Sequence, residues 1–203
     1  MTEWPGRGRG AKIAGMAQLS ESVSLDATDS SVAVLTVDNP PVNALSWHVR
    51  QGIFDGLNQA MADGASAIVL ICAGRTFIAG ADISEFGGTA PKAASLADMQ
   101  EVMENSPIPV VAAIHGTALG GGLEVALCAH YRVGLASSKF GLPEVNIGLL
   151  PGAGGTQRLP RLIGVPKALE AMTSGRHLPA SEAAADHAVP VTHVDSRPRW
   201  PQL

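Results

Sequence analysis

One feature of the sequence most restricts how this chain can fold. An apolar run leads into a cluster of glycines, and a second apolar run follows directly after them. Val110–Ile114 predicts a buried strand, three consecutive glycines follow at 120–122, and the pattern after them predicts a helix. Val32–Val37 and Ala67–Cys72 also predict strands, and the unbroken apolar run of the second is typical of a strand buried on both faces. Strands that alternate with helices indicate an α/β domain.

Two amphipathic helices are predicted between these strands. Ser46 and Ser95 are candidate N-caps, because a serine hydroxyl can accept a hydrogen bond from a free N–H of the first turn. Apolar residues fall at helical spacing after each serine, on one side of the predicted helix. These residues are Val49, Ile53, Leu57 and Met61 in the first helix, and Leu96, Met99 and Met103 in the second.

The composition indicates one globular domain. The chain has 203 residues, of which 46% are hydrophobic and 16% charged, with a formal net charge of −4. These values argue against a disordered acidic tail and against a nucleic-acid-binding protein, and no apolar run is long enough to cross a membrane. Cys72 and Cys128 stand in apolar runs, which predicts buried thiols in a cytoplasmic protein rather than a disulfide.

Three segments are expected along the chain. Residues 1–22 contain several glycines and no sustained period, so we expect a flexible leader. Residues 23–188 carry the strand and helix patterns and form the predicted domain. Residues 189–203 contain prolines and scattered charges without a period, so we expect an irregular tail.

The glycine cluster at 120–122 is also the strongest candidate for a functional site. A helix that starts there leaves backbone N–H groups free at its positive end, and the missing side chains allow a ligand to touch the main chain. This construction is typical of an oxyanion hole or an anion-binding cradle. A tight strand-to-helix turn that binds nothing would leave the same glycine pattern.

Two glutamates in apolar surroundings add a chemical signal. Glu124 lies two residues past the last glycine in an otherwise apolar helix, where a carboxylate is either paired or functional because burying it alone is costly. Glu144 follows Pro143 in a segment rich in glycine and proline, although a loop glutamate is often an ordinary surface residue. Two such carboxylates suit general acid–base catalysis, because desolvation can raise the pKa of one of them towards neutrality.

Other catalytic motifs are missing from the sequence. The glycines within residues 148–157 are not followed by the Lys-Ser/Thr pair of a phosphate-binding loop, and neither a Gly-x-Ser-x-Gly nor a His-Glu-x-x-His pattern occurs. The six histidines are scattered along the chain, so no metal site is predicted.

Several linked motifs occur together and in a fixed order. They are residues 79–82 (Ala-Gly-Ala-Asp), 120–124 (Gly-Gly-Gly-Leu-Glu), 143–144 (Pro-Glu) and 151–158 (Pro-Gly-Ala-Gly-Gly-Thr-Gln-Arg). Because these motifs occur together, residues 23–188 resemble the enoyl-CoA hydratase/isomerase (crotonase) family. The stretch 39–46 (Asn-Pro-Pro-Val-Asn-Ala-Leu-Ser) is most similar to the amino-terminal hydratase/isomerase domain of multifunctional fatty-acid oxidation proteins.

The resemblance implies a fold and a set of site residues. The fold is the crotonase-like (ClpP/crotonase) α/β spiral of ββα units, here without the family's carboxy-terminal helical layer. The backbone N–H groups of Ala81 and Gly121 would form an oxyanion hole for a thioester carbonyl, and Glu124 and Glu144 would be the catalytic carboxylates. The residues implied to bind substrate and coenzyme A are Ala44, Leu45, Ala79, Gly80, Ala81, Asp82, Ile83, Ser84, Gly120 and Gly121.

The activity implied is hydration of 2-enoyl-CoA thioesters to 3-hydroxyacyl-CoA in fatty-acid β-oxidation, with enoyl-CoA isomerisation as an additional activity. Two alternatives stay open: a family enzyme that acts on another acyl-CoA, and a truncated fragment that binds acyl-CoA with little catalysis. Hydration needs no metal or redox cofactor, and coenzyme A is part of the substrate. The expected partners are acyl-CoA and copies of the chain in a homotrimer or hexamer, with no nucleic acid and no membrane.

Two positions depart from the family pattern. Ser84 stands where some hydratases place a lysine that meets coenzyme A phosphates, which predicts weaker binding of the nucleotide part. The pattern stops near Ala188, before the helices that cover the acyl pocket and help build trimers in the family. We therefore expect exposed apolar surface near the pocket.

Overall fold

A seven-stranded sheet in the order β1-β2-β3-β4-β5-β7-β10 forms the largest layer of the fold. The computed structural model describes residues 15–27, 31–85, 93–185 and 191–192. The first three strands pair antiparallel, whereas β3, β4, β5, β7 and β10 run parallel to one another. The strands of this sheet are β1 Met16–Ser20, β2 Val23–Asp26, β3 Val32–Val37, β4 Ala67–Cys72, β5 Val110–Ile114, β7 Tyr131–Leu135 and β10 Val191–Thr192.

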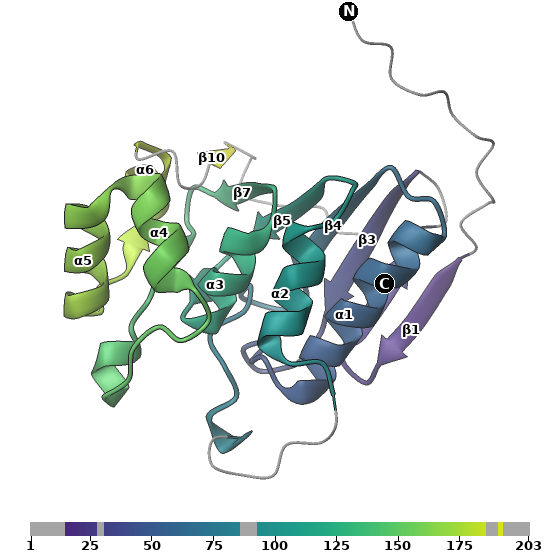
Figure 1. The fold of residues 1–203 in the computed structure, drawn as a ribbon, viewed down its shortest axis with the longest axis horizontal. Coiled ribbons are helices and arrows are strands. Elements are labelled where there is room, and N and C mark those ends of the chain that lie inside the picture. Colours follow the sequence, from purple (N-terminus) through teal and green to yellow (C-terminus); the bar gives the residue numbers. More distant parts are fainter. Residues whose placement is uncertain (1–14, 28–30, 86–92, 186–190, 193–203) are drawn as a thin grey trace, which may run out of the picture.

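Helices cover one face of this sheet. Figure 1 shows α1, α2 and α3 side by side in front of the strands, with α4, α5 and α6 gathered beyond the β7 end. The helices are α1 Trp47–Ala62, α2 Leu96–Glu104, α3 Gly121–Cys128, α4 Gly155–Ile163, α5 Val165–Ser174 and α6 Ala180–Ala185, with the short 3₁₀ helices η1 Ile83–Glu85 and η2 Glu144–Ile147.

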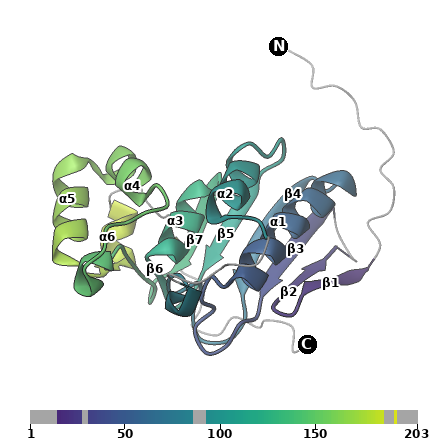
Figure 2. The same ribbon diagram turned by 60° about the horizontal axis from the view of Figure 1, so that its bottom comes forward.

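A second sheet of three strands positions the candidate site. It has the order β6-β8-β9, with β6 Thr117–Leu119, β8 Lys139–Gly141 and β9 Leu178–Pro179. The chain runs from β5 in the large sheet to β6 in the small sheet and then into α3, which is one ββα unit (Figure 2). From β5 to β8, successive strands alternate between the large and the small sheet, and the turn between β6 and α3 lies within this part of the chain.

The central helix α3 is buried along its whole length. All of its residues, including the charged Glu124, have little or no solvent exposure. Gly122 is required there for packing, because a Cβ at this position would overlap the backbone carbonyl of Ile78. The helix is therefore held directly against the chain segment that precedes Ala81.

The predicted strands and helices of the domain are confirmed. The three strand runs coincide with β3, β4 and β5, and the two helices begin directly after Ser46 and Ser95. One detail is wrong: β4 is not buried on both faces. Ile68, Leu70 and Cys72 are buried, whereas the alternate residues facing away from the helices are only partly covered.

Both ends of the chain differ in part from the sequence-based expectation. The predicted flexible leader 1–22 is wrong for Met16–Ser20, which forms β1 and pairs antiparallel with β2. The predicted irregular tail 189–203 is wrong for Val191–Thr192, which adds a parallel strand beside β7. Residues 1–14 of the leader and 193–203 of the tail lie outside the described residues, as do residues 186–190 where the domain and the tail meet.

Two further expectations concern the thiols and membrane-spanning segments. Cys72 and Cys128 are both free and buried, as predicted, and burial raises the pKa of the Cys128 thiol to about 12. Within the part of the chain that the structure describes, no helix is long and apolar enough to cross a bilayer.

The two serine caps differ in a testable way. The Ser95 hydroxyl accepts a hydrogen bond from Asp98 N and the Asp98 side chain accepts one from Ser95 N, whereas Ser46 makes no side-chain cap bond. We therefore expect Ser95→Ala to lower the free energy of unfolding by about 1 kcal/mol in urea titrations. Ser46→Ala is the matched control and should have the smaller effect; the reverse order would contradict the capping assignment.

Candidate active site

A cavity of about 720 Å³ opens between α2, the β6–α3 turn, η2 and the loop before α4. Its volume is typical of a small-molecule site. The four groups to which the sequence assigned catalytic roles all line it: Ala81, Gly121, Glu124 and Glu144. The structure therefore brings together residues that come from three separate stretches of the chain, since Gly121 and Glu124 both belong to α3.

Two backbone segments converge at one end of the cavity. Gly121 is the first residue of α3, so its N–H has no partner within the helix. The nitrogen of Ala81 lies 3.7 Å from the position that a Cβ on Gly121 would occupy. Leu45 N donates to Gly80 O at 3.0 Å, and Ala79 forms a bridge with Leu119 of β6, which fixes the segment that carries Ala81. This arrangement suits an oxyanion hole made of two N–H donors.

Glu124 is a buried carboxylate with defined hydrogen bonds. The residue is 2% exposed, and its Oε1 accepts hydrogen bonds from Ala153 N and Gly155 N, each at 2.8 Å. Both donors lie at the amino-terminal end of α4, where the helix dipole also favours negative charge. Gly155 must lack a side chain here, because its Cβ would lie 2.9 Å from Glu124 Oε1.

Glu144 has a different environment. It begins η2, and its Oε1 lies 3.2 Å from the position that a Cβ on Gly120 would occupy, so this glycine admits the carboxyl group. Its Oε2 is buried and has no hydrogen-bond partner among the described residues. Burial raises the pKa of Glu144, and the negative charge of Glu124 raises it further. The two glutamates thus differ in how strongly their surroundings stabilise the ionised form of the carboxyl.

The predicted coenzyme A residues fall into two groups. Ala79, Gly80, Ala81, Ile83, Gly120 and Gly121 line the cavity. Ala44, Leu45, Asp82 and Ser84 lie outside its lining. Leu45 is fully buried in the core, and Asp82 Oδ1 accepts hydrogen bonds from both the backbone N–H and the hydroxyl of Ser84. The Asp82 side chain thus holds the start of η1, to which Ser84 belongs, and the role of both residues in binding coenzyme A stays a prediction.

Sequence reasoning missed most of the apolar wall. Leu149 and Leu150 line the cavity and are exposed, as expected of apolar surface beside an acyl pocket. Gln100 of α2 is a buried polar residue on the helix side that carries Leu96 and Met103. A glutamine at a position of apolar spacing was the available signal for it. The other missed lining residues are Leu96, Ala97, Leu119, Pro143, Asn146, Ile147, Gly152, Ala153 and His177.

No metal centre is found in the described ranges: no three His, Cys, Asp or Glu side chains lie close enough together to hold an ion. The polar groups in the cavity wall include the two carboxyl groups, the side chains of Gln100, Asn146 and His177, and backbone N–H donors.

Comparison with known proteins gives a consistent result. A family model described as enoyl-CoA hydratase/isomerase matches residues 27–196. A peroxisomal bifunctional enzyme of Danio rerio is 52% identical over 155 residues, which cover 75% of this chain and 21% of that protein. A probable enoyl-CoA hydratase of Bacillus subtilis (strain 168) is 46% identical over 164 residues, covering 77% of this chain and 64% of the relative. The chain thus spans about a fifth of the first relative and just under two thirds of the second.

A solved structure supports the same fold. The crystal structure of an enoyl-CoA hydratase from Bacillus anthracis superposes with a TM-score of 0.78 at 36% sequence identity, covering 86% of this chain and 71% of that chain. The crotonase-like fold predicted from the linked motifs is confirmed.

Gly155 and Gly152 allow a test of how Glu124 is held. A Cβ on Gly155 would meet both Glu124 and Leu142 Cδ1, the latter at 2.8 Å. We expect Gly155→Ala to lower the free energy of unfolding by about 1–3 kcal/mol, because both neighbours are packed in the core. Gly152→Ala is the control, since the nearest atom to its Cβ would be 3.9 Å away. Equal losses in the two variants, measured by denaturant titration, would contradict this account.

The pKa of Glu144 predicts a pH dependence of stability. Because that pKa is raised in the folded state, folding favours the protonated carboxyl, and stability falls as the pH rises from the ordinary glutamate value through the raised value. We expect Glu144→Gln to remove this fall, so the free energy of unfolding should depend less on pH across that window. Glu101→Gln, on the exposed side of α2, is the control. Parallel pH curves for the protein and Glu144→Gln would refute the assignment.

Proposed function

The chain belongs to the enoyl-CoA hydratase/isomerase family, and from this premise we propose that it hydrates 2-enoyl-CoA thioesters to 3-hydroxyacyl-CoA in fatty-acid β-oxidation. The observation that carries the proposal is one cavity with Glu124 and Glu144 in its wall and the N–H groups of Ala81 and Gly121 at one end. Similarity to a probable enoyl-CoA hydratase supports it.

The N–H groups of Ala81 and Gly121 take the thioester carbonyl oxygen. When water attacks a conjugated thioester, negative charge develops on this oxygen as the enolate forms. Preorganised donors stabilise that charge without having to reorient, and losing one such donor typically costs about 3–4 kcal/mol of transition-state stabilisation. The carbonyl end of the substrate is thereby fixed, which places its double bond between the two glutamates.

The different surroundings of the two glutamates assign their roles. Glu124 accepts two N–H hydrogen bonds through Oε1, which suits a carboxylate that takes a proton from water as the water oxygen bonds to C3. Glu144, whose pKa is raised by burial, suits the acid that gives its proton to C2. The proton left on Glu124 returns to Glu144 through solvent, so each cycle consumes one water and no electrons are transferred. The proposed reaction therefore requires no metal or redox cofactor.

Isomerisation is proposed as a secondary activity of the same site. Moving a double bond from C3 to C2 needs an oxyanion hole and one group that carries a proton between C2 and C4. Glu144 suits this task because burial raises its pKa above the ordinary glutamate value, so this carboxyl holds a proton more readily than an exposed glutamate does. If the Glu124→Gln variant still converts a 3-enoyl-CoA to the 2-enoyl-CoA but no longer hydrates it, isomerisation is shown to be separate from hydration.

Assembly and location are not addressed by the site. A homotrimer or hexamer stays a prediction from the family resemblance. The cytoplasmic location stays a prediction as well, since relatives include proteins named as peroxisomal.

The proposal is tested with crotonyl-CoA and the whole chain. We expect loss of the conjugated-thioester absorbance and formation of 3-hydroxybutyryl-CoA, and we expect Glu124→Gln to reduce kcat by about 10²–10⁴-fold. Glu170→Gln, on the exposed side of α5, is the control and should keep full turnover.

Three outcomes would contradict parts of this proposal. Undiminished turnover in Glu124→Gln would remove the assigned base. Tight binding of butyryl-CoA by calorimetry without any turnover of crotonyl-CoA would instead support an acyl-CoA-binding fragment, and turnover of a different thioester alone would support another reaction of the family.

A further inference from the structure

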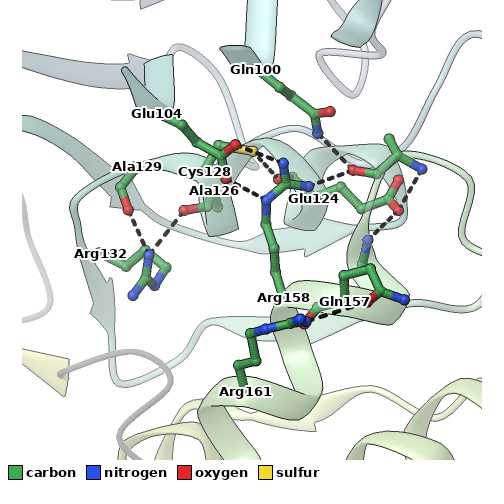
Figure 3. A network of polar contacts seen from close by, with 12 residues as sticks. Gln100, Glu104, Glu124, Ala126, Cys128, Ala129, Arg132, Gln157, Arg158 and Arg161 are labelled. Atoms are coloured by element: carbon green, nitrogen blue, oxygen red, sulfur yellow. Dashed lines mark hydrogen bonds and ion pairs between the residues drawn. The ribbon is translucent and has the colours of Figure 1, made fainter. Parts of the chain in front are cut away.

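A second layer of polar contacts surrounds Glu124, and two of its members, Gln100 and Ala153, also line the cavity. Arg158 of α4 makes two hydrogen bonds to Glu104 of α2, from Nε to Oε1 at 2.6 Å and from Nη2 to Oε2 at 3.0 Å. Its third contact is from Nη1 to the carbonyl of Ala153, at 2.8 Å. Figure 3 shows the Arg158 side chain reaching towards Glu104, with Gln100 approaching from the neighbouring turn of α2.

These contacts converge on one residue. The Ala153 carbonyl accepts from Arg158 and also from Gln100 Nε2, at 2.9 Å, while the Ala153 N–H donates to Glu124. The carbonyl and the N–H of Ala153 belong to successive peptide units that meet at its Cα, so two donors on the carbonyl hold Ala153 in place and thereby restrict where its N–H can point. Arg158 and Gln100 therefore help to position one of the two donors to Glu124.

The Arg158–Glu104 pair is built to remain ionised and ordered. The Arg158 side chain is 23% exposed, and its two parallel hydrogen bonds lower the pKa of Glu104. The backbone beside it is shaped for the guanidinium: Gly154 has a φ of +89°, and a Cβ there would overlap Arg158 Nη1. A lysine, with its single point charge, cannot bind a carboxylate at two points and the Ala153 carbonyl at a third.

We propose that Arg158, oriented by Glu104, is a positioning residue that fixes Ala153 and thereby holds the Glu124 carboxylate in its reactive orientation. The inference rests on the proposed role of Glu124 as the base in hydration. Arg158 itself does not line the cavity, so it acts through Ala153 rather than on the substrate.

The kinetic test uses Arg158→Lys, which keeps the positive charge and removes the planar group. We expect kcat for crotonyl-CoA to fall about 10–100-fold with KM nearly unchanged, because the substrate contacts are intact and only the base is misplaced. Arg161→Lys is the matched control: this residue lies one turn along the same helix, and its Nη1 donates to Gln157 O on α4 itself. It should keep the kcat of the unchanged protein.

A second variant tests the role of Glu104. Glu104→Gln removes the charge that orients Arg158, so it should lower kcat in the same direction, and the double variant with Arg158→Lys should lose less than the product of the single effects. Multiplicative losses would show that the two residues act independently, which would overturn the proposal, as would an unchanged kcat in Arg158→Lys.

A readout without catalysis separates this proposal from the proposed function. The amide protons of Ala153 and Gly155 can be followed by NMR and hydrogen exchange, with chain-wide amide signals reporting whether the variant folds. We expect Arg158→Lys to shift the Ala153 signal and speed its exchange, whereas Arg161→Lys leaves both unchanged. Unchanged Ala153 signals in Arg158→Lys would overturn the positioning role of Arg158, whatever reaction the protein catalyses. If the signals shift but the unchanged protein does not hydrate crotonyl-CoA, only the proposed role in hydration is refuted.

Discussion

The hydrogen bonds that Ala153 N and Gly155 N donate to Glu124 are the interaction on which the site depends. A carboxylate at 2% exposure inside an apolar helix would be strongly destabilising without partners, and an isolated buried charge is among the costliest features of a protein interior. The fold supplies the donors from the amino-terminal end of α4, which must therefore lie against α3. This requirement explains why glycine stands at 155, where a side chain would displace the carboxylate.

The parts of the fold predicted from sequence are those with a long, clean period. The runs at β3, β4 and β5 and the cap at Ser95 gave the strands and helices with their boundaries, because apolar spacing and a cap act locally. The missed strand β1 is an edge strand with residues exposed or half-exposed along its length, so its sequence carries no clear alternation. The strands of the small sheet have only two or three residues each, too few to show any period.

The candidate site likewise contains groups that could be identified from the sequence and groups that could not. Its candidate catalytic groups, Glu124 and Glu144, were identifiable from the sequence because a carboxylate among apolar residues and glycines is unusual in itself. The groups that support them were not, because their contacts join distant parts of the chain: Arg158 meets Glu104 across 54 residues, and Ala153 meets Glu124 across 29. Such pairs follow from tertiary packing, which a single sequence does not reveal. Gln100 is the exception, since a glutamine among the apolar positions of α2 breaks the local pattern.

The asymmetry between the two glutamates is itself a consequence of this architecture. Glu124 sits on the central helix, and its charge is balanced by donors that belong to the core. Glu144 begins a short 3₁₀ helix at the cavity wall, and no donor within the described residues reaches its Oε2. Burial disfavours the ionised carboxyl of Glu144 in the folded protein and so raises its pKa. The proposed acid and base roles thus differ through burial and hydrogen bonding, although the two side chains are chemically identical.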